Sequence, residues 1–366
     1  MDIYEALANK SIRNGILRSL RNLSPQVEKN LQEHPYLLEY AEELKKAKVE
    51  VLENLDFWID KASKILQAKG VEVFYARDAS EARNIAEKIV GANKIVVKAK
   101  SMVSEEIHLR EHLEKMGNEV LETDLGELIV QLANDKPMHS VIPALHYSEE
   151  QVAEILKKIG VNGKNAEELA KGVRIFMRKK FLNADVGISG CNALSAETGR
   201  IFLIENEGNI RLSTTLPKRY IALVGIEKIL PNDELALKSV LVQAAFFGTF
   251  PPTYINVNEK VDGQEMYAIF IDNGRKVTEF REQLLCIRCG RCQLECPVFQ
   301  NLGNVWGGSA YGGPMGVVWT AITEKRSEIC FLSTLCGKCR EVCPMKINIP
   351  EMMRKIRRLL KKSFRG

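Results

Sequence analysis

The sequence predicts an α/β domain with a mainly parallel sheet, followed by a smaller helical domain that is rich in cysteine. From Val71 onward, short β-branched runs alternate with amphipathic helical segments, which is the pattern of βαβ units. After Asn273-Gly274 this alternation stops, and short helical stretches punctuated by cysteine, glycine and proline follow. A chain of 366 residues is long enough to bury two separate cores. We therefore expect two domains.

Residues 1–65, before the α/β domain, have the periodicity of amphipathic helices. Leu, Ile and Val recur at spacings of three and four in IYEALANKSIRNGILRSLRNL and again in YLLEYAEELKKAKVEVLENLDFWIDKASKIL. We expect two or three helices here, forming an N-terminal helical segment.

The α/β domain is expected over residues 66–250. Its predicted strands are the runs VEVFYA, KIVVKA, EVLETD, ADVGISG, RIFLIEN and YIALVGIEKIL, with helical stretches between them and a closing helix from about Asn232 to Phe247. Residues 251–275 hold two further strand-like runs on either side of Asp262-Gly263, a common hairpin turn pair. They predict a strand-rich connector, built as a hairpin, in front of the cysteine-rich domain at residues 276–350.

The last segment, residues 351–366, predicts a basic amphipathic helix. Met352 and Ile356 fall on one side of such a helix, and Arg354 and Arg358 fall on the other. A helix of this kind packs on its own domain or, as the alternative, lies on a membrane surface or on a partner.

Composition narrows the class of protein. The content of 45% hydrophobic and 27% charged residues is that of a soluble globular protein, and no apolar run approaches the roughly 20 residues of a membrane helix. The N-terminus lacks the apolar stretch of a secretory signal, so a cytoplasmic location is expected, with peripheral membrane association left open. The net charge of +5 is too mild to indicate nucleic acid as a partner.

Cysteine usage gives the strongest functional signal. Of the nine cysteines, Cys191 stands alone and the rest lie between Cys286 and Cys343. In a reducing compartment, such clustering indicates metal ligands rather than disulfides. The first run, CIRCGRCQLECP, has the C-x2-C-x2-C-x3-C-P spacing of ferredoxins, in which three thiolates bind one cluster and the fourth crosses to the other.

The second run, CGKCREVCP, has Ser333 where a perfect copy would place its first cysteine. Cys330, further upstream, is the candidate for the missing ligand. If Cys330 does not reach, the second site is a [3Fe-4S] centre or has a ligand other than cysteine. Assigning each run its own cluster uses the same residues. Under the crossed rule, the predicted ligands are Cys286, Cys289, Cys292 and Cys343 for one [4Fe-4S] cluster, and Cys296, Cys330, Cys336 and Cys339 for the other.

Zinc is the alternative occupant, because C-x2-C pairs also bind zinc tetrahedrally. The third cysteine, the following x3-C-P and the repetition of the pattern differ from zinc-ribbon spacing. The stretch between Cys296 and Cys336 is too long for a compact bacterial ferredoxin and favours a helical ferredoxin domain. Two clusters in one small domain form an electron relay.

Several long motifs resemble one protein family. The segments TDLGELIVQLANDKPMHSVIPALH, ADVGISGCNALSAETGRIFLIENEGNIRLSTTLPKRYIALVGIEKILP, DNGR and CIRCGRCQLECPVF are similar to the lactate utilisation protein B family, the iron–sulfur subunit of a lactate utilisation system. The similarity extends from about Ile3 to Met352. It implies a LUD domain, similar in fold to the NagB/RpiA/CoA-transferase group, followed by an α-helical ferredoxin domain with two [4Fe-4S] clusters.

The resemblance also implies a role in a cytoplasmic complex that oxidises L-lactate, or a related 2-hydroxy acid, to pyruvate. The implied partners are a cysteine-rich (CCG-type) redox subunit and a second LUD-domain subunit. Longer family members continue past the second run, and the loop NLGNVWGGSAYGGPMG replaces a histidine-containing version. The alternatives are therefore the electron outlet of a flavin-dependent 2-hydroxy-acid dehydrogenase, or an assembly module whose LUD domain binds no substrate.

Within the LUD domain, polar residues gather on both sides of the IFLIE run. Ligands of open α/β sheets bind beyond the carboxyl ends of the strands. Arg211, aided by Lys98 or Lys100, could bind the carboxylate of a 2-hydroxy acid, and a glutamate could act as acid or base. The alternative is that these side chains only cap turns and bind backbone groups. The candidate catalytic residues are Glu197, Glu205, Glu207 and Arg211.

Overall fold

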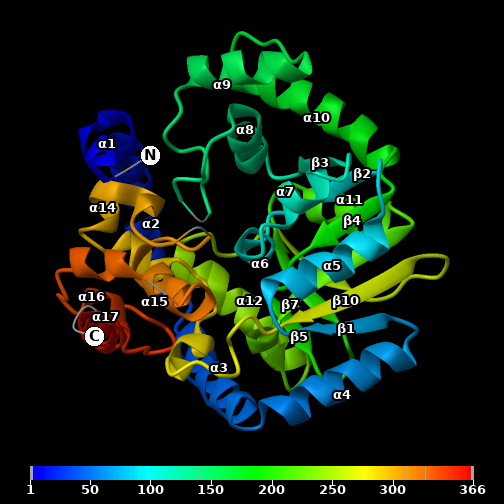
Figure 1. Ribbon diagram of the computed structural model, residues 1–366. Coiled ribbons are helices and arrows are strands. Elements are labelled where there is room, and N and C mark those ends of the chain that lie inside the picture. Colours follow the sequence, from blue (N-terminus) through cyan, green and yellow to red (C-terminus); the bar gives the residue numbers. More distant parts are fainter. Residues whose placement is uncertain (1–2, 140, 309, 326, 364–366) are drawn as a thin grey trace.

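The main sheet of the molecule is parallel. The computed structural model describes residues 3–139, 141–308, 310–325 and 327–363. In these residues, neighbouring strands of the sheet pair in parallel in the order β1-β10-β7-β4-β2-β3 (Figure 1). The prediction of a mainly parallel α/β sheet is confirmed. The strands are β1 (Glu72–Ala76), β2 (Ile95–Lys98), β3 (Glu119–Glu122), β4 (Val186–Ser189), β7 (Arg219–Gly225) and β10 (Glu265–Ile271).

Helices cover both faces of this sheet. Ala222 of β7 belongs to a hydrophobic cluster with α4 (Leu55–Ala68), whereas Ile221 belongs to a cluster with α5 (Ala79–Val90). Because successive side chains of a strand point to opposite faces, a strand covered on both sides needs a continuous apolar run. The other helices of this part are α6 (Met102–Glu106), α7 (Leu109–Glu114), α8 (Leu125–Ala133), α9 (Glu149–Leu156), η1 (Lys157–Ile159), α10 (Ala166–Leu182), α11 (Asn209–Thr215), η2 (Ile226–Lys228) and α12 (Asp233–Phe247).

Polar caps set where several of these helices begin. The side chains of Asp78, Asp124 and Asn232 each accept a hydrogen bond from a backbone N–H of the first turn, which would otherwise lack a partner. The helical stretch expected between the predicted strands KIVVKA and EVLETD is interrupted, because His108 adopts a left-handed backbone (φ 50°) between α6 and α7.

A second, smaller sheet has the strand order β8-β5-β6-β9. The expected hairpin around Asp262-Gly263 is wrong, because β9 pairs with β6 while β10 enters the main sheet between β1 and β7. The physical reason is burial: β10 is apolar and buried along most of its length, which suits a central parallel strand, whereas β9 is partly exposed and lies at an edge. The strands are β5 (Ala193–Ser195), β6 (Ile201–Glu205), β8 (Ile229–Leu230) and β9 (Tyr254–Asn258).

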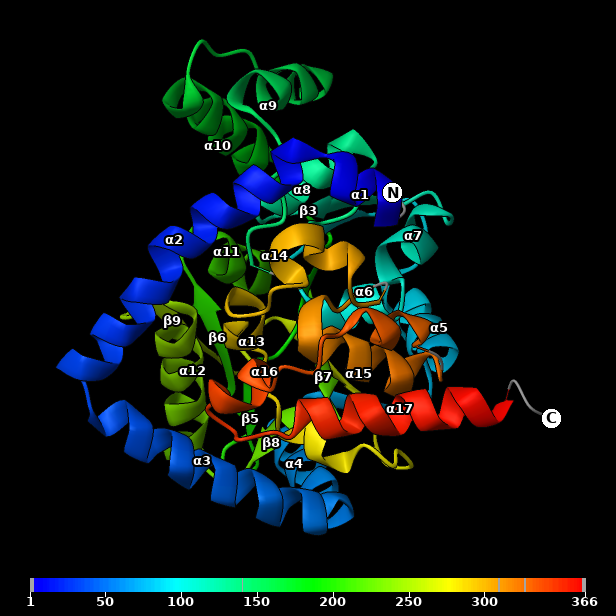
Figure 2. The same ribbon diagram turned by 90° about the vertical axis from the view of Figure 1, so that its left-hand side faces the viewer.

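The N-terminal segment has more helices than the two or three expected. In the described residues it contains α1 (Ile3–Ala8), α2 (Lys10–Glu33), α3 (Tyr36–Glu53) and α4. Helix α2 contacts α12 of the α/β part and α14 of the cysteine-rich part, and α3 also packs on α12 (Figure 2). One hydrophobic cluster consequently includes Ile12 of α2, Phe247 of α12 and Trp319 of the cysteine-rich part. The N-terminal helices thus pack against both parts.

In the cysteine-rich part, the described elements are helices and turns of 3-10 helix, most of them of three to five residues. The final helix, α17 (Ile349–Ser363), buries Met352, Met353 and Ile356 in the large cluster, so it packs on its own domain. Residues 364–366 lie outside the described residues. No described helix is long and apolar enough to cross a membrane. The other elements are η3 (Arg281–Leu285), α13 (Arg291–Leu294), α14 (Phe299–Leu302), η4 (Gly303–Val305), α15 (Gly313–Thr323), η5 (Glu328–Leu332) and α16 (Lys338–Glu341).

Candidate iron–sulfur sites and the adjoining cavity

Four cysteines drawn from both runs lie together. Cys286, Cys289, Cys292 and Cys343 line one small cavity of about 20 Å³, and we call them the first cysteine group. Burial raises the pKa of the Cys343 thiol, and the nearby Cys286 adds to this effect. Cys343 comes from the second run, as the crossed arrangement expects. Four sulfur donors around one void are the donor set of a cysteine-ligated cluster.

Cys296, Cys336 and Cys339 form a second cysteine group. Burial raises the pKa of the Cys339 thiol to about 12, and Cys296 and Cys336 both contribute. This group lies nearer to solvent, because Cys336 is exposed whereas Cys289 and Cys292 are buried.

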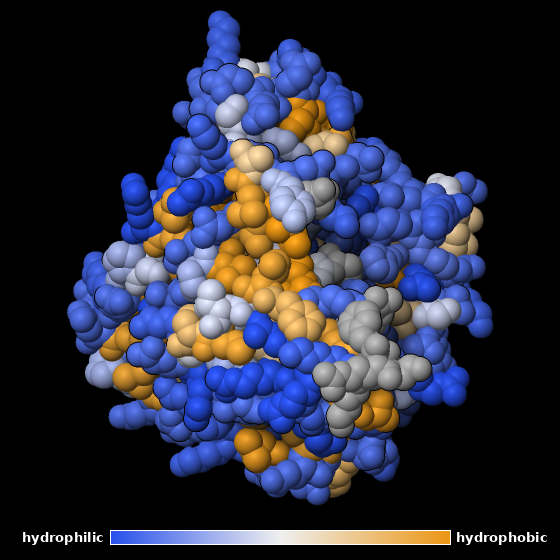
Figure 3. Space-filling model, turned by 60° about the vertical axis from the view of Figure 1, so that its left-hand side comes forward, coloured by the Kyte–Doolittle hydropathy of each residue, from blue (hydrophilic) through white to orange (hydrophobic). Residues whose placement is uncertain are grey.

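Figure 3 views the side that carries the C-terminal helices and shows hydrophobic side chains gathered near its centre, with hydrophilic ones around them.

Cys330 has different neighbours. It is fully buried in η5, and its carbonyl accepts a hydrogen bond from Arg357 Nη2 at 2.7 Å. Burial raises the pKa of its thiol, and the charges that act on it are those of Arg357 and Glu328. Within the described ranges, no group of three or more His, Cys, Asp or Glu side chains is arranged to hold a single metal ion.

Arg288 connects the first cysteine group to the α/β part. It lies between Cys286 and Cys289, and its Nη2 donates to Glu227 Oε1 at 2.6 Å. Arg275 Nε donates to the other oxygen of Glu227, also at 2.6 Å. Burial alone would raise the pKa of Glu227, but the two guanidinium groups lower it well below its usual range. Glu227 is therefore ionised and pairs with both cations.

The same network continues to the glycine-rich loop. Arg275 forms a two-point ion pair with Glu106, with both N···O distances at 2.8 Å, and the Tyr311 hydroxyl donates to Glu106 at 2.5 Å. The Tyr311 ring stacks on Trp319 with the centroids 5.5 Å apart. A Cβ at Gly316 would lie 2.1 Å from the Tyr311 carbonyl oxygen, so only glycine allows this close packing. The loop thereby holds Tyr311 in the network.

A cavity of about 310 Å³ lies between the α/β part and the first cysteine group. Residues that follow β2, β4 and β7 line it, and Arg288 and Cys289 form the wall toward the cysteine-rich part. Ligands of open α/β sheets bind at this end of the strands. The polar side chains in its walls include Lys100, Asp124, Asn192, Glu205, Glu207, Lys228 and Gln243.

Only two of the four predicted catalytic residues line this cavity. Glu205 and Glu207 line it, whereas Glu197 and Arg211 do not. Glu205 accepts hydrogen bonds from the backbone N–H of Arg211 and from the amide of Asn256, which is the backbone-binding role held open as the alternative. Burial raises the pKa of Glu207 to about 6. A carboxyl group with a pKa of about 6 can take up or release a proton near neutral pH.

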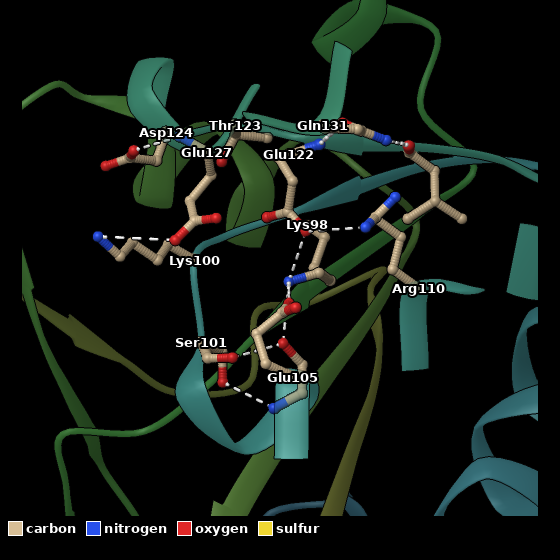
Figure 4. Close-up of polar contacts among 12 residues, drawn as sticks. Lys98, Lys100, Ser101, Glu105, Arg110, Glu122, Thr123, Asp124, Glu127 and Gln131 are labelled. Carbon is tan, nitrogen blue, oxygen red and sulfur yellow. Dashed lines mark hydrogen bonds and ion pairs between the residues drawn. The ribbon is translucent and has the colours of Figure 1, made fainter. Parts of the chain in front are cut away.

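Lys98 forms ion pairs in the interior of the protein, whereas Lys100 faces the cavity. Lys98 is fully buried, with its Nζ 3.0 Å from Glu105 and 2.8 Å from Glu122 (Figure 4). Burial raises the pKa of Glu122 to about 8, against the opposing effect of Lys98. Lys100 lies 3.8 Å from Glu127 and lines the cavity. Of the two lysines considered as carboxylate ligands, Lys100 is the accessible one.

Sequence reasoning missed Lys228. This side chain lines the cavity, is only 5% exposed, and makes no hydrogen bond or ion pair with another described residue. Burial lowers its pKa to about 7. A signal was present in the sequence, because Glu227 and Lys228 are the charged residues inside the otherwise apolar run YIALVGIEKIL. A buried charge of this kind needs a partner or a function.

Comparison with known proteins assigns both parts to families. Residues 59–265 match the LUD domain, and residues 282–347 match the 4Fe-4S dicluster domain. The chain is 40% identical to lactate utilization protein B of Bacillus licheniformis over 348 residues, which cover 89% of this chain and 72% of the relative. The chain belongs to the lactate utilization protein B family. Its counterpart in Bacillus subtilis (strain 168) is 41% identical over 329 residues, covering 84% of this chain and 68% of that protein.

Membership in the lactate utilization protein B family confirms the resemblance found in the sequence. The dicluster match confirms the prediction of [4Fe-4S] clusters in the cysteine-rich part. Among solved structures, a DUF162 family protein from Deinococcus radiodurans matches with a TM-score of 0.36 and 12% identity, covering 59% of this chain and 98% of that one.

Proposed function

We propose that this chain is the iron–sulfur electron-transfer subunit of a cytoplasmic complex that oxidises L-lactate, or a related 2-hydroxy acid, to pyruvate. The names of its relatives, which refer to lactate utilization, support the substrate class. The observation that carries the proposal is the order of the sites in space. The cavity borders Cys289 of the first cysteine group, and the second group reaches the surface at Cys336.

The proposed cofactors are two [4Fe-4S] clusters. When bound, they supply one-electron transfer, at potentials that depend on charge, hydrogen bonds and solvent exposure around the sulfurs. Arg288 places a buried cation beside the first group. Three ligands of the second site are Cys296, Cys336 and Cys339. The ligands proposed for the first site are Cys286, Cys289, Cys292 and Cys343.

The LUD part, which we propose shares the fold of the NagB/RpiA/CoA-transferase group, supplies the substrate side of the relay. Glu207 is the acid–base group that we retain from the sequence candidates, because it lines the cavity and its pKa is raised to about 6 by burial. Glu205 positions the loop through its bond to the Arg211 backbone. The cysteine-rich part acts as an α-helical ferredoxin domain.

The proposed partners are a cysteine-rich (CCG-type) redox subunit and a second LUD-domain subunit. Phe331 and Leu332 are 46% and 36% exposed on η5, in the stretch that leads to Cys336, and offer apolar contact area for such a subunit. Electron exchange at the more exposed cysteine group requires the partner to approach this side of the molecule.

The test is anaerobic purification of the tagged chain from its native host, followed by addition of L-lactate. We expect the two partner subunits to co-purify and the clusters to bleach with lactate in the complex but not in the isolated chain. Co-purification with a flavin-dependent dehydrogenase would replace this proposal by the second candidate, an electron outlet for that enzyme. A complex whose clusters lactate never reduces would overturn the assignment.

A further inference from the structure

The two cysteine runs are copies of one structural unit. Each unit begins with a five-residue turn of 3-10 helix, η3 or η5. The residue that ends each turn is extended, with φ −61° and ψ 121° at Cys286, and φ −64° and ψ 131° at Ser333. Two positions further on, Arg288 and Leu335 are both left-handed, with φ 59° and 55°. A left-handed conformation is uncommon for residues other than glycine, so its occurrence at both positions indicates that the two units share the same backbone conformation.

The correspondence continues through the rest of each run. Gly290 and Gly337 are both left-handed, with φ 78° and 89°, and each caps the short helix that carries the next cysteine. Ser333 is therefore the structural counterpart of a ligand in the first unit. The corresponding pairs are Cys286 with Ser333, Cys289 with Cys336, Cys292 with Cys339, and Cys296 with Cys343.

The side chains of Cys286 and Ser333 also make the same contact. The backbone N–H of Arg288 donates to the Cys286 sulfur at 3.3 Å, and the backbone N–H of Leu335 donates to the Ser333 hydroxyl oxygen at 3.2 Å. The serine oxygen thus has the position relative to its own unit that the cysteine sulfur has in the first. An N–H directed at a ligand atom stabilises negative charge on it.

Cys330 does not occupy the position in its unit that corresponds to a ligand of the first unit. Its counterpart in the first unit is Gln283, and both side chains are fully buried, at 0% exposure. Cys330 belongs to the large hydrophobic cluster, and Arg357 holds its carbonyl. The side chain of Cys330 therefore takes part in packing of the interior.

We infer that the Ser333 oxygen, rather than the Cys330 sulfur, is the fourth protein ligand of the second iron–sulfur cluster, beside Cys296, Cys336 and Cys339. This inference rests on the proposed pair of clusters. On binding, the hydroxyl releases its proton to solvent and one Fe–O bond forms, with no change in oxidation state. Oxygen is a harder donor than thiolate sulfur. The second cluster is consequently the one that loses an iron more readily and responds selectively to changes at Ser333.

The test compares S333A, S333C and C330A with the wild type after anaerobic cluster reconstitution, by iron analysis and electron paramagnetic resonance. We expect S333A to lose about one of the eight irons of two cubanes and to show a three-iron signal. S333C keeps full iron content and shifts the potential of one cluster only, while C330A matches the wild type. A three-iron signal in C330A but not in S333A would overturn the inference, as would an S333A protein identical to the wild type. Neither lactate nor a partner is needed, so failure here leaves the proposed function standing.

A separate observation concerns the cavity beside the first cysteine group. Lys228 faces it as a buried amine without a hydrogen bond or ion pair to a described residue, and Arg288 Nε also lacks a hydrogen-bond partner among those residues. The carboxylates in the walls are partly engaged, since Asp124 accepts from the Glu127 backbone at 3.0 Å. A buried, unpaired cation costs free energy, and a bound anion removes that cost. The volume of about 310 Å³ is at the lower end of the range for small-molecule sites.

We propose that this cavity binds a small 2-hydroxy or 2-oxo acid, with Lys228 as the anchor for its carboxylate and Lys100 as a second cation. This deepens the proposed function by locating the substrate against Cys289. Lys218 is the matched control, because it is exposed and precedes β7 whereas Lys228 follows the other end of that strand.

The test is calorimetric titration of the cluster-loaded chain with pyruvate and with L-lactate. We expect K228Q to weaken binding at least tenfold, K228R to retain most of it, and K218Q to match the wild type, with iron content unchanged in all three. Equal binding to K228Q and the wild type would contradict the site, as would acetate binding as tightly as pyruvate. Absence of binding together with intact lactate-driven reduction in the complex would remove this site but not the electron-transfer role.

Discussion

Arg288 lies between two cysteines of the first group, yet its guanidinium group donates to Glu227 of the α/β part at 2.6 Å. Glu227 also accepts from Arg275, and all three side chains are buried. The cysteine-rich part is therefore not a separate module joined by a flexible segment. Its first cysteine group is held against the cavity by an ionic contact that crosses between the two parts.

Replacing Glu227 by Gln should strongly destabilise the protein. The change leaves two buried guanidinium groups without their shared carboxylate, and breaking a buried ion pair in this way costs about 3–5 kcal/mol. We expect the free energy of unfolding, measured anaerobically in urea, to fall by about this amount. E234Q is the control, because Glu234 pairs with Lys238 at the surface of α12 and should change stability by less than about 1 kcal/mol. Equal effects of the two variants would show that the buried network does not stabilise the junction.

Alanine substitutions at Gly290 and Gly337 should differ in severity. Both residues are left-handed, so a Cβ costs roughly 1–2 kcal/mol at either position. At Gly290 the Cβ would also lie 3.2 Å from the ring of Phe247, whereas at Gly337 it would meet nothing within 4 Å. We expect G290A to be the less stable protein and to retain less iron after reconstitution. Identical unfolding midpoints would argue against close packing of the first unit on α12.

The titration of Glu122 should make the stability of the folded protein fall as the pH rises toward 8. Burial raises the folded-state pKa of this carboxyl to about 8, above the value of about 4.3 expected in the unfolded chain. A raised pKa means that the folded state holds the proton more tightly, so the stabilising contribution is complete below the unfolded pKa and is lost as the pH rises toward 8.

Thermal midpoints measured from about pH 5 to pH 8 should therefore decline less in E122Q than in the wild type, because glutamine does not titrate. E53Q, at an exposed position of α3, should follow the wild-type profile. An equal decline in E122Q and the wild type would show that Glu122 is ionised over this whole pH range, as the partner of Lys98, and would contradict the raised pKa.

The features that sequence patterns predicted are those fixed by local or periodic signals. The apolar run of β7 predicted a buried strand, which the structure contains. The spacing of the first cysteine run predicted [4Fe-4S] clusters, which the dicluster match confirms. The hairpin was wrong because Asp262-Gly263 indicates a turn but not which strand pairs with which. Burial across the whole sheet placed β10 between β1 and β7 instead.

The substrate side was harder to predict, for a related reason. Arg211 and Glu207 are four positions apart in the sequence, yet only Glu207 lines the cavity. The Arg211 guanidinium group instead lies over the ring of Tyr254, 4.4 Å from its centroid. Lys228 could be recognised as unusual within an apolar run, but its lack of a partner is a property of the folded chain. The difference between Ser333 and Cys330 likewise depends on backbone geometry, which spacing alone does not give.

The measurement that tests the central claim most directly is the content of iron, zinc and acid-labile sulfide in the anaerobically purified chain, combined with a redox titration followed by electron paramagnetic resonance. The account predicts about eight irons and eight sulfides per chain and two separately reducible centres. Zinc without iron, or a single reducible centre with about four irons, would contradict it.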